Sequence, residues 1–250
     1  MEAFKLEGRV AVVTGARTGI GQAIALGLAD AGAGLVLWGH GADFGETAEI
    51  LQQGGRLVRT VDADLADRDR VGAACSELLE ETKVDILVNN AGIIRRGPAI
   101  DSPAADWDAV MAVNLDSAFF LAQRFARPML ERGAGKIINI ASVLSTQGGI
   151  NVVAYVAAKH GIAGLTRALA NEWAPRGVQV NAIAPGYIRT NNTKPLLEDS
   201  VRYKAILERI PAGRWGSPSD VVGAAVFLSS PASDYVNGHL LAVDGGWLSR

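Results

Sequence analysis

Tyr155 and Lys159 have the residue types and the spacing of a proton-transfer pair. In a helix, side chains four residues apart lie on one face. A free phenol has a pKa of about 10 and is a poor base at neutral pH, but a neighbouring ammonium group favours the phenolate. The pair alone does not distinguish a reactive site from a surface pair, so its meaning depends on the residues around it.

Ser142 closes an apolar run over 136–142, thirteen positions before Tyr155, and we expect this run to be a strand. Ligands of open α/β sheets bind at the carboxyl ends of strands, so a hydroxyl group there can hydrogen-bond a reacting oxygen. Asn114 lies in a predicted helix before that strand. Its residue type alone fits an ordinary helical residue equally well.

A glycine-rich turn, TGARTGIG over 14–21, follows the first apolar run. Gly15 permits a tight turn, and Gly19 and Gly21 allow the backbone to approach a pyrophosphate or the helix to pack closely on the strand. The following helix would present N–H groups and its positive dipole end to phosphates. The spacing is G-x-x-x-G-x-G rather than G-x-G-x-x-G, and glycines also serve ordinary turns.

The elements that must position these residues alternate regularly along the chain. Apolar runs predict strands at 10–14, 35–38, 56–62, 85–89, 136–142, 178–184 and 239–243, and helical patterns fall at 20–31, 43–54, 67–82, 104–130, 153–174 and 218–229. Such alternation predicts an α/β, Rossmann-like, doubly wound parallel sheet of about seven strands with helices on both faces. We expect one domain over 1–250, with the least regular stretch, 187–217, serving as a functional loop or lid.

Composition narrows the class of protein. The 250 residues carry a net charge of -2, whereas a nucleic-acid-binding domain is usually basic. The single cysteine, Cys75, excludes an intramolecular disulfide, and no Cys/His cluster indicates a metal site. The chain shows neither a signal peptide nor a run of about 18 apolar residues. We therefore expect a cytoplasmic protein without nucleic-acid or membrane partners.

Several motifs together give the chain a family resemblance. They are TGARTGIG at 14–21, DADL at 62–65, NNAG at 89–92, Asn114, Ser142, YVAAK at 155–159 and PG at 185–186. The chain resembles the short-chain dehydrogenase/reductase family over essentially its whole length. The resemblance implies an oxidoreductase that moves a hydride between NAD(P) and a carbinol carbon.

The resemblance also implies residue roles. Tyr155 would be the general acid/base, Ser142 would position the substrate oxygen, Lys159 would lower the tyrosine pKa and bind a ribose, and Asn114 would support a water-linked proton path. The residues it places around the cofactor are Gly15, Arg17, Thr18, Gly19, Ile20, Gly21, His40, Asp64, Leu65, Asn90, Ala91, Gly92, Tyr155, Lys159, Pro185, Gly186, Ile188 and Thr190.

The choice between NAD and NADP depends on the residue after the second strand. A carboxylate there binds the ribose 2′-hydroxyl of NAD, while a nearby arginine accommodates the 2′-phosphate of NADP. Gly39 stands where the acid is expected, and Arg17 and His40 are near enough in sequence to meet a phosphate. These charges leave the cofactor open, and a narrower resemblance favours NAD.

That narrower resemblance is to family members acting on sugar acids of the 2-deoxy-D-gluconate or 2-dehydro-3-deoxy-D-gluconate type. It rests on segments at 92–96, 147–150, 171–173, 181–187, 190–193, 210–216 and 243–247. Arg95 or Arg96 would bind the substrate carboxylate. Gln147, Asn151 and Asn192 would meet hydroxyls, as would Ser142. Lys194, Arg202 and Arg214 are further cationic candidates.

Two alternatives stay open. Reductases of 3-oxoacyl groups on acyl carrier protein share the catalytic residues, and a non-catalytic NAD(P)-binding sensor would keep the fold without turnover. The family resemblance also implies a homotetramer, with segments 104–130 and 153–174 at one two-fold interface. The last strand and the Trp247 tail would lie at the other interface.

Overall fold

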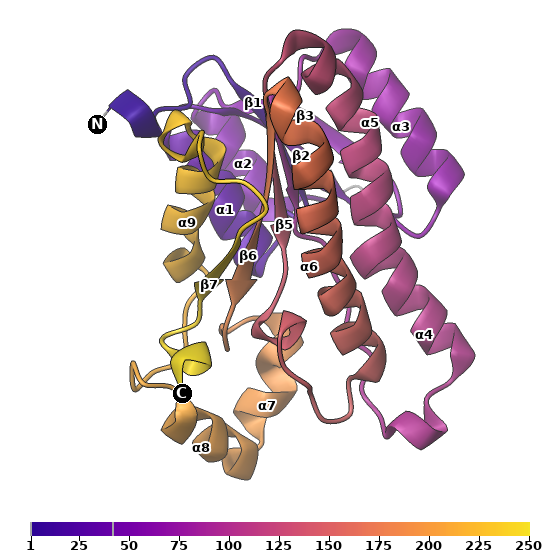
Figure 1. The fold of residues 1–250 in the computed structure, drawn as a ribbon, viewed down its shortest axis with the longest axis vertical. Helices are drawn as coiled ribbons and strands as arrows, with labels where there is room; N and C mark the ends of the chain where they lie inside the picture. The colour runs from indigo at the N-terminus through magenta and orange to yellow at the C-terminus, as the bar shows by residue number, and fades with distance from the viewer. Residues whose placement is uncertain (1, 42) are drawn as a thin grey trace.

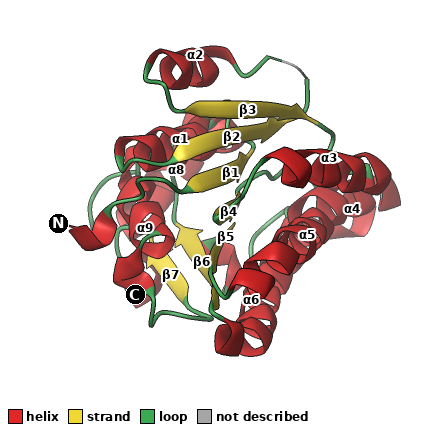
Figure 2. Ribbon diagram, turned by 90° about the horizontal axis from the view of Figure 1, so that it is seen from above, coloured by secondary structure: helices red, strands yellow, loops and turns green. Residues whose placement is uncertain are grey.

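The computed structural model describes residues 2–41 and 43–250, and these form a seven-stranded sheet with helices on both faces (Figures 1 and 2). The sheet order is β3-β2-β1-β4-β5-β6-β7, and every neighbouring pair is parallel. The strands are β1 (Val10–Thr14), β2 (Gly34–Gly39), β3 (Leu57–Asp62), β4 (Ile86–Asn89), β5 (Gly135–Ile140), β6 (Val178–Pro185) and β7 (Leu240–Val243). The predicted doubly wound parallel sheet is confirmed.

The helices divide between the two faces of the sheet. Seen from above, α3, α4, α5 and α6 cover one face, whereas α1 and α9 cover the other (Figure 2). The helix bounds are α1 (Gly19–Asp30), α2 (Gly45–Gln53), α3 (Arg68–Glu81), α4 (Ala104–Met111), α5 (Ser117–Arg132), α6 (Val153–Trp173), α7 (Lys194–Glu198), α8 (Ser200–Arg209) and α9 (Ser219–Ser229). The short helices α7 and α8 lie together beyond the ends of β6 and β7 (Figure 1).

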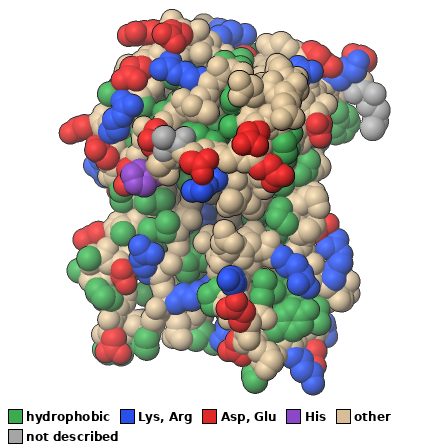
Figure 3. Space-filling view, turned by 180° about the vertical axis from the view of Figure 1, so that it is seen from behind, with side chains coloured by type: hydrophobic (Ala, Val, Ile, Leu, Met, Phe, Trp, Pro, Cys, Tyr) green, Lys and Arg blue, Asp and Glu red, His purple; other side chains and the backbone are tan. Residues whose placement is uncertain are grey.

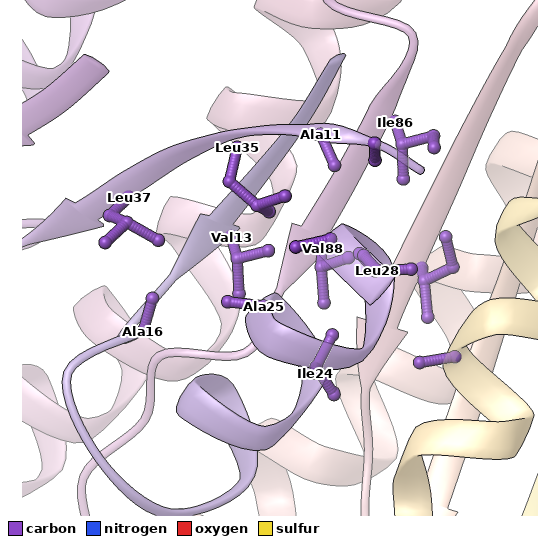
Figure 4. Packing of buried hydrophobic residues seen from close by; sticks show 14 of the residues in the cluster. Ala11, Val13, Ala16, Ile24, Ala25, Leu28, Leu35, Leu37, Ile86 and Val88 are labelled. Atoms are coloured by element: carbon purple, nitrogen blue, oxygen red, sulfur yellow. The ribbon is translucent and has the colours of Figure 1, made fainter. Parts of the chain in front are cut away.

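Strand residues alternate between two hydrophobic clusters. Ala11 and Val13 pack with Ile24 and Leu28 of α1, whereas Val12 faces the cluster formed with α3, α5 and α6. Figure 4 shows the first of these clusters, in which side chains of β1, β2 and β4 meet α1. Both faces of the sheet are therefore buried, which explains the continuous apolar runs of its strands.

The chain reverses its winding direction between β1 and β4. It runs outward from β1 through β2 to β3, then returns to place β4 on the other side of β1. At such a switch point the loops after the two strands diverge and leave a crevice at their carboxyl ends. Thr14 and Asn89 end these two strands, so their following loops flank the crevice.

Three predicted boundaries are wrong. The fifth strand ends at Ile140, so Ser142 begins a short 3-10 turn instead of closing the strand. The helix predicted over 104–130 is divided by a π-helical turn, Ala112–Asp116. The stretch 187–217 is more regular than a loop, because it holds α7 and α8 around buried aromatic residues.

Candidate active site

A cleft of about 560 Å³ opens at the carboxyl ends of the central strands. All the residues predicted around the cofactor line it except Arg17. The sequence did not single out Thr193, although this residue lines the cleft and its hydroxyl hydrogen-bonds the carbonyl oxygens of Ile188 and Thr190. The capping spacing of Thr190 and Thr193 was the available signal.

The glycine turn leaves space at the N-terminus of α1. Gly15 has a φ of +64°, and a Cβ atom on Gly21 would collide with the Gly15 carbonyl oxygen. The Asn90 amide donates to the carbonyl oxygens of Thr14 at 2.8 Å and Gly15 at 3.2 Å, which ties the turn to the loop after β4. Thr18, at the N-cap, makes no side-chain capping bond within the described chain. The open helix end and close glycine packing fit a dinucleotide pyrophosphate.

Tyr155 and Lys159 share one face of α6, as their spacing predicted. The Lys159 Nζ donates to the Ile140 carbonyl oxygen at 2.6 Å and lies 5.6 Å from the Tyr155 ring centroid. Lys159 is buried, and its burial lowers the pKa of its ammonium group to about 8. The backbone at the end of β5 therefore holds the ammonium group beside the phenol.

Ser142 and Tyr155 meet beside this lysine. The Ser142 hydroxyl accepts a hydrogen bond from the Leu144 N–H at 3.1 Å, which fixes the serine just beyond β5. Burial raises the pKa of the Tyr155 phenol, while a hydrogen bond with Ser142 and the charge of Arg96 oppose this rise. Ser142 and Arg96 thus favour the phenolate here, and the stabilisation of the phenolate by Lys159 stays a prediction.

Asn114 occupies the π-helical turn and is buried. Its Oδ1 accepts from the Ile93 N–H at 2.8 Å, and its Nδ2 donates to the Ile93 carbonyl oxygen at 2.9 Å. The side chain thereby fixes the loop after β4 from behind. It does not line the cleft, so its geometry supports a positioning role for this loop.

Only some of the residues predicted to bind the substrate line a cavity. Arg96 lines a second, smaller cavity of about 100 Å³ beside Tyr155, and Asn192 lines the main cleft. Arg95 lines neither cavity and instead pairs with Asp106 at 3.4 Å. Gln147 and Asn151 line neither cavity either. The Gln147 Oε1 accepts from the Trp247 indole N–H, and the Asn151 backbone carbonyl oxygen accepts from the Gly97 N–H.

Comparisons with known proteins agree with this geometry. A family model described as enoyl-(acyl carrier protein) reductase matches residues 15–248. The crystal structure of a short-chain type dehydrogenase/reductase from Mycobacterium marinum is 32% identical, with a TM-score of 0.93, and the match covers 100% of this chain and 99% of that one. This chain belongs to the short-chain dehydrogenase/reductase family. The expected NAD(P)-dependent oxidoreductase acting on CH–OH groups is thereby confirmed.

Other members of the family are more similar to this one. A 2-dehydro-3-deoxy-D-gluconate 5-dehydrogenase from Bacillus subtilis is 56% identical over 249 residues, which cover 100% of this chain and 98% of that protein. A protein from Agrobacterium tumefaciens, provisionally named a 2-deoxy-D-gluconate 3-dehydrogenase, was crystallised with NADP. It is 56% identical with complete coverage of both chains, and its TM-score is 0.94.

In this family member, the cleft has no carboxylate directly after β2. Gly39 and His40 line the cleft there, and a Cβ atom on Gly39 would lie only 3.0 Å from the Phe44 ring. Arg17 lies outside the cleft lining, and its Nη2 is 3.0 Å from the Asp43 carboxylate. Arg17, a candidate for binding a 2′-phosphate, therefore already has an acidic partner.

From behind, the surface is hollowed between the larger upper part and the lower part, and Lys and Arg side chains gather below the hollow (Figure 3).

The described residues contain no group of three or more His, Cys, Asp or Glu side chains placed to hold a metal ion. None of the helices in residues 2–41 and 43–250 has the length and apolar character needed to cross a bilayer.

Proposed function

We propose that this protein oxidises the C5 hydroxyl group of 2-dehydro-3-deoxy-D-gluconate to a ketone, and catalyses the reverse reduction. The observation that carries the proposal is the meeting of Tyr155 and Ser142 where the cleft joins the smaller cavity. The full-length similarity to the Bacillus subtilis enzyme supports this substrate. The neighbouring arginine, Arg96, suits the carboxylate of a sugar acid.

In the oxidation, the substrate O–H proton passes to the Tyr155 phenolate while the C–H bond breaks and a C=O bond forms. Bound NAD(P)⁺ supplies the chemistry of accepting the hydride at its nicotinamide ring. Ser142 holds the substrate oxygen, and Lys159 holds positive charge beside the phenol. In the reduction, Tyr155 donates its proton to the new alkoxide oxygen.

Burial raises the Tyr155 pKa, so the unliganded site holds a neutral phenol at neutral pH. A neutral phenol is the acid that the reduction needs, whereas the oxidation needs the phenolate. We therefore expect kcat/KM for oxidation to rise with pH and kcat/KM for reduction to fall with pH.

We also propose a preference for NAD over NADP. Arg17 is paired with Asp43, and Lys159 is the one lysine or arginine that lines the described cleft. A 2′-phosphate would thus find little unpaired positive charge. Replacing Asp43 with Asn should release Arg17 and raise kcat/KM for NADP severalfold with little change for NAD. Equal kcat/KM changes for both cofactors would contradict this explanation.

The function is tested by following reduced nicotinamide absorbance with a panel of sugar acids, neutral polyols and a 3-oxoacyl carrier substrate. Wild-type protein should prefer the sugar acids, and Tyr155→Phe should lose about 10²- to 10⁴-fold in kcat while its cofactor dissociation constant stays close to wild type. Preference for the acyl substrate would support the carrier-protein alternative, and cofactor binding without any turnover would support a sensor.

We propose further that residues 1–250 act as one domain, that the protein is cytoplasmic, and that it assembles as a homotetramer. Trp247 is buried within its own chain, so a tetramer interface near the C-terminus would use other parts of this tail. Light scattering on the purified protein measures the assembly directly.

A further inference from the structure

The smaller cavity is the substrate side of the reacting groups. It shares Ile94, Ser142, Tyr155, Gly186 and Thr193 with the main cleft but none of the residues of the glycine turn. Its volume of about 100 Å³ is that of roughly three liquid water molecules. This space suits one end of a six-carbon acid, with the remaining carbons extending towards Tyr155.

Two guanidinium groups meet in this cavity. Arg96 comes from the loop after β4 and is exposed, while the half-buried Arg202 comes from the first turn of α8. No aspartate or glutamate is present among the described residues that line the cavity. Burial lowers the pKa of Arg96, Tyr155 opposes this shift, and the charge of Arg202 adds to it. Such a pair attracts an anion.

The other cationic candidates already have acidic partners. Arg95 pairs with Asp106, Arg214 makes two contacts of 2.7 Å with Asp220, and Lys194 lies 3.7 Å from Glu198. Within the described residues, neither the Arg96 nor the Arg202 side chain makes such an ion pair. Charge pairing therefore separates these two arginines from their neighbours in sequence.

Both guanidinium groups are held but retain free donors. The Arg96 Nη2 donates to the Asn192 carbonyl oxygen at 2.9 Å, which uses one of the five N–H groups of a guanidinium. Arg202 lies one turn before the buried Ile206, so it shares the inward face of α8. Asp199 accepts from the Arg202 backbone N–H at 3.0 Å and fixes this helix start. The remaining donors can take a carboxylate in a bidentate manner.

We propose that Arg96 and Arg202 together bind the carboxylate of the substrate and thereby orient its carbinol carbon at Tyr155. The inference deepens the proposed function, since it names the groups that would select a sugar acid over a neutral sugar. It assigns the selection to one loop after β4 and one helix of the 187–217 region, which close on the substrate from two sides.

The kinetic test compares 2-dehydro-3-deoxy-D-gluconate with its uncharged methyl ester. In Arg96→Met and in Arg202→Met, KM for the acid should rise about 10- to 100-fold, because a hydrogen bond to a charged group is worth about 1.5–3 kcal/mol. The KM for the ester should change by less than about threefold, and kcat for the acid should change less than its KM. Arg95→Met is the matched control and should behave as wild type for both compounds.

A binding measurement separates this inference from the proposed reaction. Calorimetric titration of D-gluconate into Tyr155→Phe protein saturated with cofactor should give a dissociation constant that rises when Arg96→Met or Arg202→Met is added. Thermal unfolding midpoints within a few degrees of the parent protein exclude a folding defect as the cause.

Two outcomes would overturn the proposed binding of the carboxylate by Arg96 and Arg202, here called the clamp. One is an equal rise in KM for the acid and the ester in the arginine variants. The other is a rise in KM for the acid in Arg95→Met as large as that in Arg96→Met. A wild-type protein that turns over no sugar acid would instead refute the proposed function. Loss of gluconate binding in the two arginine variants would still support the clamp in that case.

Discussion

At the scale of single residues, the site depends on a charged lysine where water is almost absent. Lys159 is 4% exposed, and its ammonium group donates a hydrogen bond to the Ile140 carbonyl oxygen. Desolvation disfavours an ammonium group, and a neutral carbonyl offsets only part of this cost. The charged form of Lys159 therefore weakens the folded state.

This cost predicts how Lys159→Met changes stability with pH. Because the folded-state pKa of about 8 lies below the ordinary lysine value of 10.5, the unfolded chain binds more protons between these values. Wild-type stability relative to the variant should thus be lowest below pH 8 and rise by about 3 kcal/mol as the pH approaches 10.5. Urea unfolding of the unliganded proteins at several pH values measures this difference.

A difference in unfolding free energy that is independent of pH would show that the pKa of Lys159 is the same in the folded protein and in the unfolded chain. Measurement on unliganded protein matters here, because a bound dinucleotide would add its own interactions with the lysine.

At the scale of elements, the π-helical turn between α4 and α5 explains the position of the loop after β4. The extra residue in the turn directs Asn114 out of the helix and onto the Ile93 backbone, with which it exchanges two hydrogen bonds. π-helical turns inside α-helices often occur at functional sites. This loop continues to Arg96, so one helical irregularity contributes to the geometry on the substrate side.

Asn114→Ala should destabilise the protein by about 2–4 kcal/mol, since it leaves two backbone groups without partners at a buried position. It should also raise KM for the substrate, because the loop carrying Arg96 loses its support. Urea unfolding and steady-state kinetics measure the two effects. The exposed helical residue Asn171 provides the control, and Asn171→Ala should change stability by less than about 0.5 kcal/mol.

If the urea midpoint of Asn114→Ala equalled that of the wild-type protein, the two hydrogen bonds of Asn114 would not stabilise the loop after β4. The water-linked proton path expected through Asn114 stays a separate prediction, since its effect would fall on kcat and its pH profile.

At the scale of the whole molecule, the C-terminal segment packs against α8 and the loop after β5. Trp247 is buried against Tyr187 at a centroid distance of 4.6 Å, and Arg209 of α8 lies 4.0 Å above its ring. Its indole N–H donates to the Gln147 Oε1 at 2.8 Å. The last residues of the chain thus join α8 to the loop that follows Ser142.

Trp247→Ala should lower the free energy of unfolding by about 3–5 kcal/mol if the hydrophobic cluster around Trp247 unfolds together with the sheet. The KM for the substrate should rise more than the cofactor dissociation constant, because Trp247 supports α8 but does not line the main cleft. Denaturant unfolding, substrate kinetics and cofactor titration measure these three quantities. Replacing the exposed Tyr235 with Ala is the control and should leave all three near wild type.

A substrate KM that stays at the wild-type value in Trp247→Ala would show that α8 holds its position without the tail. A cofactor affinity that falls as much as the substrate affinity would show instead that the whole sheet is disturbed.

The sequence by itself determined the sheet, its strand positions within a few residues, the glycine turn and the Tyr155–Lys159 pair. These features are local, because apolar runs, glycine spacing and a helical Tyr–Lys pair each depend on short stretches of chain. Family motifs added the roles of residues such as Asn114, which its local pattern left ambiguous.

Only the tertiary structure decided which arginines lie near Tyr155. Arg95 and Arg96 are neighbours in sequence, yet one pairs with Asp106 and the other turns into the small cavity beside Arg202. Likewise, Arg17 belongs to the glycine turn but pairs with Asp43 outside the cleft lining. The physical reason is that an ionic partner is chosen by distance in space, and distant segments meet only when the sheet brings its loops to one edge.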